Sequence, residues 1–290
     1  MPTSPLQSPV LSATDVLREA TMSLKRAHID TAALDARLLL QHVLGISHER
    51  LLAGDLPALT PRQEADYQEL ITKRGGWQPV AQLTGRREFY GREFKVTEHT
   101  LDPRADSEAV IEAVFEWVRK NGAKPQTILD LGTGTGCLLL TLLGKFDNAK
   151  GVGVDISEEA LNVARDNAIS FEMPERASFK RSHWGDAVEG KFDIIVANPP
   201  YIPTGSIAGL TPEVSHEPMV ALDGGVDGLV HYRTIMPQLN RLLAEDGIAA
   251  FEIGMGYENE MEKIIINSGL RLCAVKQDLS GISRCLVVSH

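Results

Sequence analysis

The chain has 290 residues and a mass of 31.7 kDa, enough for one large domain and one small domain. With 43% hydrophobic and 23% charged residues it has the composition of a globular protein with a substantial core. The formal net charge of −10 argues against a protein that grips nucleic acid through its overall field, and no apolar run reaches the ~20 residues that span a bilayer.

The N-terminal segment, residues 1–13, is rich in proline and serine and is predicted to be a disordered tail. It lacks the charged start and apolar middle of a signal peptide. The three cysteines, Cys137, Cys273 and Cys285, are too scattered for a disulfide framework or a zinc site. We therefore expect a cytoplasmic protein without a bound metal.

Residues 14–75 follow a helical pattern throughout and are predicted to form a small helical bundle. Thr14 is expected to cap the first helix. The segment that begins at Asp35 repeats the helical period and stops at Gly45. Thr60 and Pro61 supply an N-cap followed by proline at the first helical position, which opens a further helix.

Residues 76–105 are predicted to be a linker that contains a β-hairpin. Gly75 and Gly76 break the helical pattern. Two short strand-like pieces follow, at residues 79–83 and 88–96, and the second is interrupted by Gly91.

Residues 106–290 alternate between strand and helix patterns, which predicts a parallel sheet covered on both faces. Ser107 is expected to begin a helix that ends at Asn121 and Gly122. The predicted strands are 127–131, 151–154, 192–196 and 248–253, and the predicted helices between them are 137–143, 158–168 and 232–243.

The strand 127–131 runs into a glycine loop made of Gly132, Thr133, Gly134, Thr135 and Gly136. Glycines let a backbone approach a ligand closely, and the helix start beyond favours a negative group. Dinucleotide-binding loops need a small residue where this chain has Cys137. The spacing from Asp130 to Gly136 instead resembles motif I of class I S-adenosylmethionine methyltransferases.

Asp155 ends the next predicted strand, where a carboxylate can accept hydrogen bonds from both hydroxyls of a ribose. It could also simply cap the helix that follows. An acid at this place supports a nucleoside ligand but does not separate NAD from S-adenosylmethionine, because both carry a ribose there.

Asn198, Pro199, Pro200 and Tyr201 form a rigid corner after the buried strand 192–196. The carboxyl ends of parallel strands line one crevice, so Asn198 is predicted to lie near the glycine loop. The lone pair of a planar amino group is delocalised, so the nitrogen is a poor nucleophile unless its geometry is held. The side-chain oxygen of Asn198 and the carbonyl of Pro199 could hold such a group by its two N–H bonds, while Tyr201 stacks on it. The corner is therefore predicted to be a clamp for an amino group that accepts a methyl group.

From Ile202 to Gly228 the chain is rich in proline and glycine and has little periodicity, which favours a substrate-facing lid. His216 and Glu217 within it have no partners with metal-ligand spacing and are expected to be structural.

Clamps of this kind occur both in adenine-N6 methyltransferases of nucleic acids and in glutamine-N5 methyltransferases of proteins. The rest of the chain resembles the second group, in particular the release factor glutamine methyltransferases of the HemK/PrmC family. The resemblance covers nearly the whole chain past residue 14. It rests on Leu34-Asp-Ala-Arg-Leu-Leu39, on Pro79–Phe94 and most specifically on Glu217–Arg233, a segment that adenine methyltransferases lack.

The resemblance implies a class I S-adenosylmethionine-dependent methyltransferase, with a Rossmann-like, mainly parallel seven-stranded sheet and a small N-terminal helical bundle. Its implied substrate is the glutamine of the Gly-Gly-Gln motif in peptide chain release factors, with no membrane and no direct nucleic-acid binding. Gly132–Gly136, Asp155, Trp184 and Asn198 would contact the cofactor, and Asn198–Tyr201 the glutamine.

The chain departs from the family pattern at Ala105, where proline is usual, at His183, where an acid usually precedes the aromatic residue, and at Gly256, where glutamine is usual. The helical region is expected to recognise the protein substrate.

Overall fold

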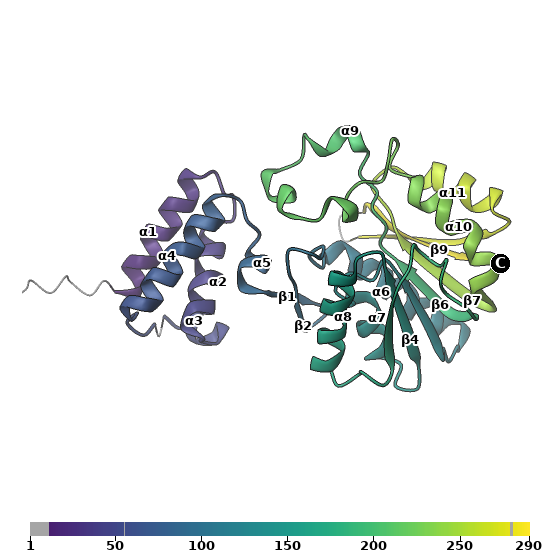
Figure 1. Cartoon of the computed structure of the whole chain (residues 1–290), viewed down its shortest axis with the longest axis horizontal. Coiled ribbons are helices and arrows are strands. Elements are labelled where there is room, and N and C mark those ends of the chain that lie inside the picture. The colour runs from purple at the N-terminus through teal and green to yellow at the C-terminus, as the bar shows by residue number, and fades with distance from the viewer. Residues whose placement is uncertain (1–11, 55, 279–280) are drawn as a thin grey trace, which may run out of the picture. The chain divides into compact units, whose positions relative to one another are not determined.

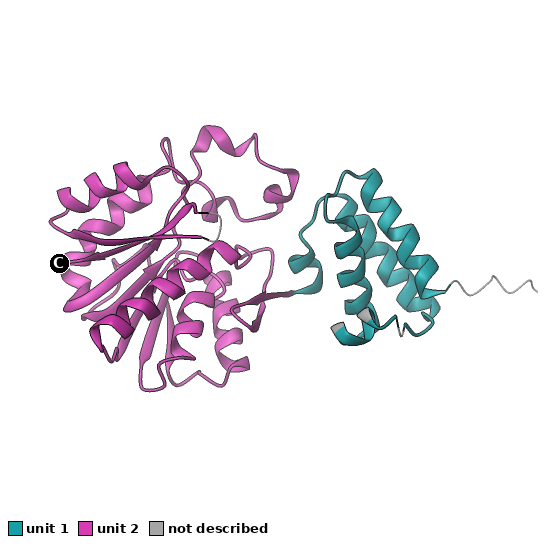
Figure 2. Cartoon of the chain, turned by 180° about the vertical axis from the view of Figure 1, so that it is seen from behind, with its two compact units in different colours: residues 1–85 teal, residues 86–290 magenta. Residues whose placement is uncertain are grey.

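The computed structural model describes residues 12–54, 56–278 and 281–290. The chain divides into two compact units, the first running to Gly85 and the second spanning Arg86–His290 (Figure 2). The boundary lies inside the segment 76–105 that the sequence predicts as a linker. Residues 1–11 of the predicted tail lie outside the described residues, and no described helix is long and apolar enough to cross a membrane.

The first unit is helical, as the sequence predicts (Figure 1). Its helices are α1 (Ala13–Arg26), α2 (Ala32–Leu44), α3 (His48–Leu52), α4 (Pro61–Gly75) and α5 (Val80–Thr84). The predicted end at Gly45 is confirmed by its left-handed backbone, and Thr60 forms a reciprocal capping box with Gln63. Apolar side chains of α1, α2 and α4 form the core, where Leu24, Leu39 and Tyr67 are buried.

Two local predictions in this unit are wrong. The cap of α1 is Ser12 rather than Thr14, because the Ser12 side chain accepts a hydrogen bond from the backbone N–H of Asp15 at 3.1 Å. Residues 80–84, which overlap the first piece predicted as strand-like (79–83), form helix α5 instead. Val80 and Leu83 pack on the core of the first unit, and this tertiary contact overrides the β preference of the short segment.

The predicted hairpin is confirmed at β1 (Arg86–Phe89) and β2 (Arg92–Lys95), which pair antiparallel. Tyr90 and Gly91 between them both have positive φ, as a tight two-residue hairpin turn requires. Phe89 and Phe94 are buried in the core of the second unit. The hairpin therefore belongs structurally to the second unit.

The second unit contains a seven-stranded sheet with the order β5-β4-β3-β6-β7-β9-β8. All neighbouring pairs are parallel except the two that involve β9. The strands are β3 (Thr127–Leu131), β4 (Lys150–Asp155), β5 (Ala177–Arg181), β6 (Phe192–Ala197), β7 (Leu243–Glu252), β8 (Arg271–Gln277) and β9 (Ser283–Ser289). The sequence located β3, β4, β6 and β7 but not the other three.

Helices cover both faces of this sheet, as predicted (Figure 1). Side chains of α6 (Glu108–Asn121), α7 (Cys137–Leu143) and α8 (Glu158–Ser170) contribute to the core on one face. Those of α10 (Val230–Leu242) and α11 (Glu258–Asn267) contribute to the core on the other. The predicted start of α6 is confirmed by Ser107 as its N-terminal flanking residue and its end by left-handed Gly122.

The carboxyl ends of β4, β3, β6 and β7 lie side by side in the sheet. Strands β4 and β7 end at Asp155 and Glu252, whereas β3 and β6 are followed directly by the glycine loop and by Asn198. The remaining elements are short: η1 (Ala105–Ser107), α9 (Thr204–Ile207), η2 (Pro212–His216) and η3 (Met219–Ala221). The last three lie within the segment 202–228, so this edge of the sheet and that segment frame the candidate site.

Candidate active site

The glycine loop joins β3 to α7 and lines a cavity at the carboxyl edge of the sheet. Gly132 has a φ of +76°, and a Cβ at this position would lie 3.1 Å from the Trp184 ring. Only glycine meets both conditions without strain. Gly136 does not line the cavity but begins α7 with a φ of +79°. The predicted loop therefore forms one wall of a cavity and leads into a helix N-terminus.

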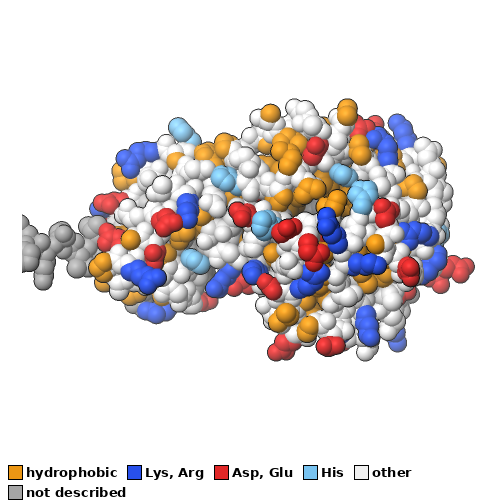
Figure 3. All heavy atoms as spheres, in the orientation of Figure 1, with side chains coloured by type: hydrophobic (Ala, Val, Ile, Leu, Met, Phe, Trp, Pro, Cys, Tyr) orange, Lys and Arg blue, Asp and Glu red, His pale blue; other side chains and the backbone are white. Residues whose placement is uncertain are grey.

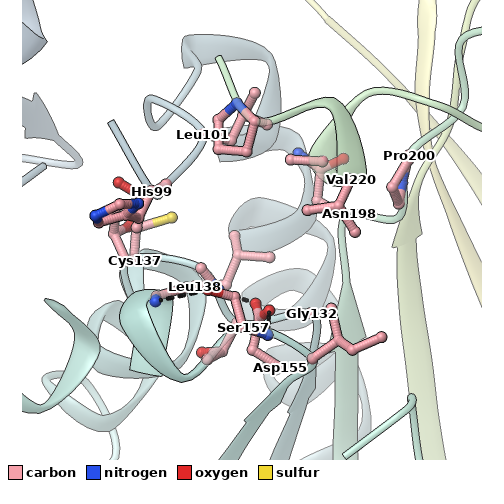
Figure 4. Close-up of a pocket in the computed structure, with 18 of the residues that line it drawn as sticks. His99, Leu101, Gly132, Cys137, Leu138, Asp155, Ser157, Asn198, Pro200 and Val220 are labelled. Carbon is pink, nitrogen blue, oxygen red and sulfur yellow. Dashed lines mark hydrogen bonds between the residues drawn. The ribbon is translucent and has the colours of Figure 1, made fainter. Parts of the chain in front are cut away.

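Asp155 lies at the end of β4 and faces the same cavity (Figure 4). One carboxylate oxygen accepts from the backbone N–H of Gly134 at 3.0 Å and the other from that of Ser157 at 3.0 Å. Burial raises the pKa of this carboxyl, and the backbone hydrogen bonds oppose that shift. Asp155 thus holds the glycine loop against the first turn of α8 and also presents a carboxylate to the cavity.

Trp184 forms another part of the cavity wall. Its backbone has a φ of +50°, an uncommon conformation for a bulky residue, and its ring packs on the core beneath α10. The ring centre lies 5.2 Å from that of His231. Within the described chain its buried Nε1 has no hydrogen-bond partner. An aromatic face beside an unused donor fits a ligand with a flat heterocycle, such as a nucleoside.

The corner after β6 lies between two cavities. Asn198 and Pro200 line the cavity of the glycine loop and also a second cavity, while Pro199 and Tyr201 line only the second. In Figure 4, Asn198 and Pro200 are drawn above and to the right of Gly132 and Asp155. The predicted clamp therefore borders both cavities, with Asn198 and Pro200 lining each of them.

Ser107 and Glu252 hold the corner in place, and the sequence analysis missed this role. The Nδ2 of Asn198 donates to the hydroxyl of Ser107 at 3.2 Å, and that hydroxyl donates to Glu252. The hydroxyl of Tyr201 also donates to Glu252, at 3.3 Å. Burial raises the pKa of Glu252 to about 7. A charged residue at the end of the apolar strand 248–253 is a signal of the same kind as Asp155 and could have revealed it.

The segment 202–228 lines the second cavity through Leu210, Val214, Glu217, Ala221 and Leu222. Glu217 forms an ion pair with Arg104, and burial raises the pKa of the Glu217 carboxyl. Gly228 has a φ of +78°, and a Cβ there would lie 2.4 Å from the carbonyl oxygen of Tyr201. A glycine at this position therefore lets the segment pack directly on the backbone of the clamp.

Hydrophobic side chains gather between the segment that carries α9 and helix α8 on the face in Figure 3. Met219 and Val220 are more than half exposed, and Val220 also lines the first cavity.

Among the described residues, no group of three or more His, Cys, Asp and Glu side chains is arranged to hold a metal ion.

The strand order and the place of the glycine loop assign the chain to the class I S-adenosylmethionine-dependent methyltransferases. A methyltransferase small domain model matches residues 111–211, and a PrmC N-terminal domain model matches residues 15–85. The chain belongs to the release factor glutamine methyltransferase family, on the evidence of its relatives.

A release factor glutamine methyltransferase of Rhodospirillum rubrum is 41% identical over 273 residues, which cover 94% of this chain and 83% of the relative. One of Cereibacter sphaeroides is 40% identical, with coverage of 94% and 97%. The solved catalytic domain of hMettl16 superposes with a TM-score of 0.56 at 12% identity, covering 79% of this chain and 82% of that chain. That last likeness concerns the fold alone.

Proposed function

We propose that this methyltransferase transfers a methyl group from S-adenosylmethionine to the side-chain nitrogen N5 of the glutamine in the Gly-Gly-Gln motif of peptide chain release factors. The names of its relatives support a glutamine of release factors as the substrate. The observation that carries the proposal is the position of Asn198 between two cavities, one with nucleoside-binding features and one beside the clamp.

The residues of the first cavity are suited to S-adenosylmethionine. Asp155 would accept from the ribose hydroxyls, and Trp184 would stack on the adenine and leave Nε1 for a polar contact. When bound, the cofactor supplies a methyl group made electrophilic by a sulfonium. The proposed cofactor-binding residues are Gly132, Thr133, Gly134, Thr135, Asp155, Trp184 and Asn198; Gly136 was predicted with them, but it does not line the cavity and instead supports the turn into α7.

The clamp would hold the substrate amide from the second cavity. The Oδ1 of Asn198 and the carbonyl oxygen of Pro199 are the acceptors for its two N–H bonds. Tyr201 offers an aromatic face, and Pro200 keeps the corner rigid. Held this way, the nitrogen points toward the first cavity, and its loss of conjugation is offset by two hydrogen bonds. The methylated nitrogen loses its extra proton to solvent afterwards, so the chemistry depends on positioning and electrostatics rather than on a general base.

A labelling experiment separates this activity from adenine-N6 methylation, which uses the same kind of clamp. The protein is incubated with S-adenosylmethionine carrying a radiolabelled methyl group and with a release factor, its Gly-Gly-Ala variant, or DNA and RNA. We expect label on the release factor and none on the variant. Label on nucleic acid alone would overturn the proposal.

The Trp184→Ala variant is expected to bind S-adenosylmethionine with an affinity lower by about 1 kcal/mol, because the adenine loses an aromatic face. Trp184→Phe, which keeps a face, is the matched control and should lose less. Isothermal titration calorimetry measures both, with circular dichroism to verify folding. An unchanged affinity for the alanine variant would leave Trp184 as a core residue only.

The first unit is proposed to recognise the protein substrate. The glycine loop, Asp155 and the clamp all lie in the second unit, so the chemistry does not require the first. One glutamine is a small target, and selecting it among many cellular glutamines needs contact area elsewhere. Standard interfaces bury about 800 Å² on each partner. The simpler alternative is that the first unit only covers an apolar face of the catalytic domain.

A truncated protein beginning at Arg86 tests this role. We expect it to bind S-adenosylmethionine normally and to methylate a short Gly-Gly-Gln peptide. Its preference for the whole release factor over the peptide should fall by about tenfold, equivalent to the loss of ~1.4 kcal/mol of contacts. Aggregation, or a retained preference, would favour the covering role.

The segment 202–228 is proposed to act as a lid over the substrate, because it lines the second cavity beside the clamp. The proposed partners are release factors in the cytoplasm, with neither a membrane nor direct nucleic-acid binding involved. Electrophoretic mobility shifts with RNA and DNA would test the last point.

A further inference from the structure

The side chain of Asn198 could lie in either of two orientations that differ in function. A carboxamide has an accepting oxygen at one end and a donating NH2 group at the other, and the two ends are nearly equal in size. The proposed clamp needs the oxygen toward the substrate amide. The reverse orientation would place two N–H donors against the N–H donors of the substrate. Something in the protein must therefore select one orientation.

The groups behind Asn198 form a hydrogen-bonded chain of three side chains. Asn198 donates through Nδ2 to Ser107 at 3.2 Å, and Ser107 donates to Glu252. Ser107 is 2% exposed and Glu252 is 1% exposed, so water does not compete for these bonds. Ser107 stands before α6 and Glu252 ends β7, so rigid elements hold both.

A serine hydroxyl has one hydrogen, and this fact sets the direction of the whole chain. When the hydrogen is donated to the Glu252 carboxylate, the Ser107 oxygen is left as an acceptor. Its neighbour must then be the NH2 end of Asn198, which turns Oδ1 away from Ser107. We propose that Ser107 and Glu252 are positioning residues that fix the Asn198 amide with its oxygen toward the methyl acceptor. This inference rests on the proposed function of the clamp.

The orientation depends on the charge of Glu252. A carboxylate can only accept, whereas a protonated carboxyl can donate to Ser107 and free the hydroxyl hydrogen to point at Asn198. The amide would then favour its reversed orientation. The ionisable groups around this carboxyl are Asp106, Cys137, Tyr201, Tyr232, Arg284 and Cys285. Asp106 and Arg284 pair with each other at 3.0 Å and so largely offset each other.

Because the pKa of Glu252 lies at about 7, its ionised form predominates above neutral pH. Turnover at saturating cofactor and peptide should therefore be highest above pH 7 and should fall as the pH drops through 7. A substrate glutamine does not titrate in this range, so the decline reports on the enzyme. Asp130 beneath the glycine loop also has a pKa raised by burial to about 7. Asp130 does not belong to this hydrogen-bonded chain. A decline in turnover caused by Asp130 would therefore remain in a variant without the Ser107 hydroxyl.

The test compares Ser107→Ala with Ser107→Thr, which keeps the hydroxyl. For each, kcat and KM for a Gly-Gly-Gln peptide are measured between pH 6 and pH 9, and cofactor affinity is measured by calorimetry. We expect Ser107→Ala to lower kcat at pH 8.5 about tenfold, the scale of one buried hydrogen bond. Its cofactor affinity should stay unchanged and its acidic decline should vanish. Ser107→Thr should keep both the rate, within about threefold, and the decline.

Glu252→Gln provides an independent variant, because its side chain keeps the size of glutamate but cannot ionise. Its kcat should not change between pH 6 and pH 9, because the group whose ionisation causes the decline is gone. The inference is wrong if Ser107→Ala turns over at the wild-type rate or keeps the acidic decline. If the wild-type enzyme does not methylate the glutamine at any pH, the proposed function fails instead, and the two failures are thereby distinguished.

Discussion

Replacing Asn198 by alanine is expected to lower the rate of methyl transfer about a hundredfold or more, the usual effect of removing one preorganised polar group. The alanine side chain has no acceptor for the substrate N–H bond. The Pro199 carbonyl alone would then hold the amide, which could rotate out of line. Single-turnover measurement with a Gly-Gly-Gln peptide at saturating cofactor isolates the chemical step from binding and product release.

Asn162→Ala is a suitable control, because Asn162 lies on the exposed face of α8 and contacts only Arg165 among the hydrogen-bond partners described for it. It should turn over at the wild-type rate. The Asn198 variant should still fold, since its side chain makes a single hydrogen bond to Ser107 among the described residues. A near wild-type single-turnover rate in a folded Asn198→Ala enzyme would refute the clamp.

Replacing Asp155 by alanine is expected to weaken S-adenosylmethionine binding by about 1.5–3 kcal/mol, the range for hydrogen bonds to a charged group. Two losses combine in this variant. The ribose would lose its acceptor, and the N–H of Gly134 would lose the carboxylate that holds the glycine loop. Isothermal titration calorimetry gives the difference in binding free energy directly.

Asp155→Asn refines the experiment, because asparagine keeps one acceptor but no charge. It should retain part of the affinity, so the order wild type, asparagine, alanine is expected. Asp166→Ala is the matched acidic control, since Asp166 pairs with Lys95 at 2.7 Å where both side chains are half exposed. Unchanged affinity in a folded Asp155→Ala protein would reduce this residue to a support of the loop and the helix.

The sequence by itself determined the elements that have strong local signals. The bounds of β3 and α7 are those predicted, because a run of buried apolar residues ends at a glycine loop and a helix follows at once. The crevice could also be predicted, since parallel strands bring their carboxyl ends to one edge whatever the details of packing. That rule alone placed Asp155, the glycine loop and Asn198 around it.

Short and exposed segments lack such signals. Strand β8 shows no alternation of polar and apolar residues, lies at the edge of the sheet and has no buried residue. It is a strand because β9 offers it backbone partners. Helix α5 likewise forms where the core of the first unit receives Val80 and Leu83. In both cases a neighbour distant in sequence supplies the stabilisation.

Only the tertiary structure showed what orients the clamp. Ser107 and Asn198 are 91 residues apart in sequence, and Ser107 and Glu252 are 145 apart. In the local sequence, Ser107 indicates only a helix start, Glu252 only a strand end and Asn198 only a turn. Their hydrogen bonds exist because α6 begins beside the ends of β6 and β7. The sequence thus determined which groups face the crevice, whereas their directions depend on packing between distant segments, which local patterns do not encode.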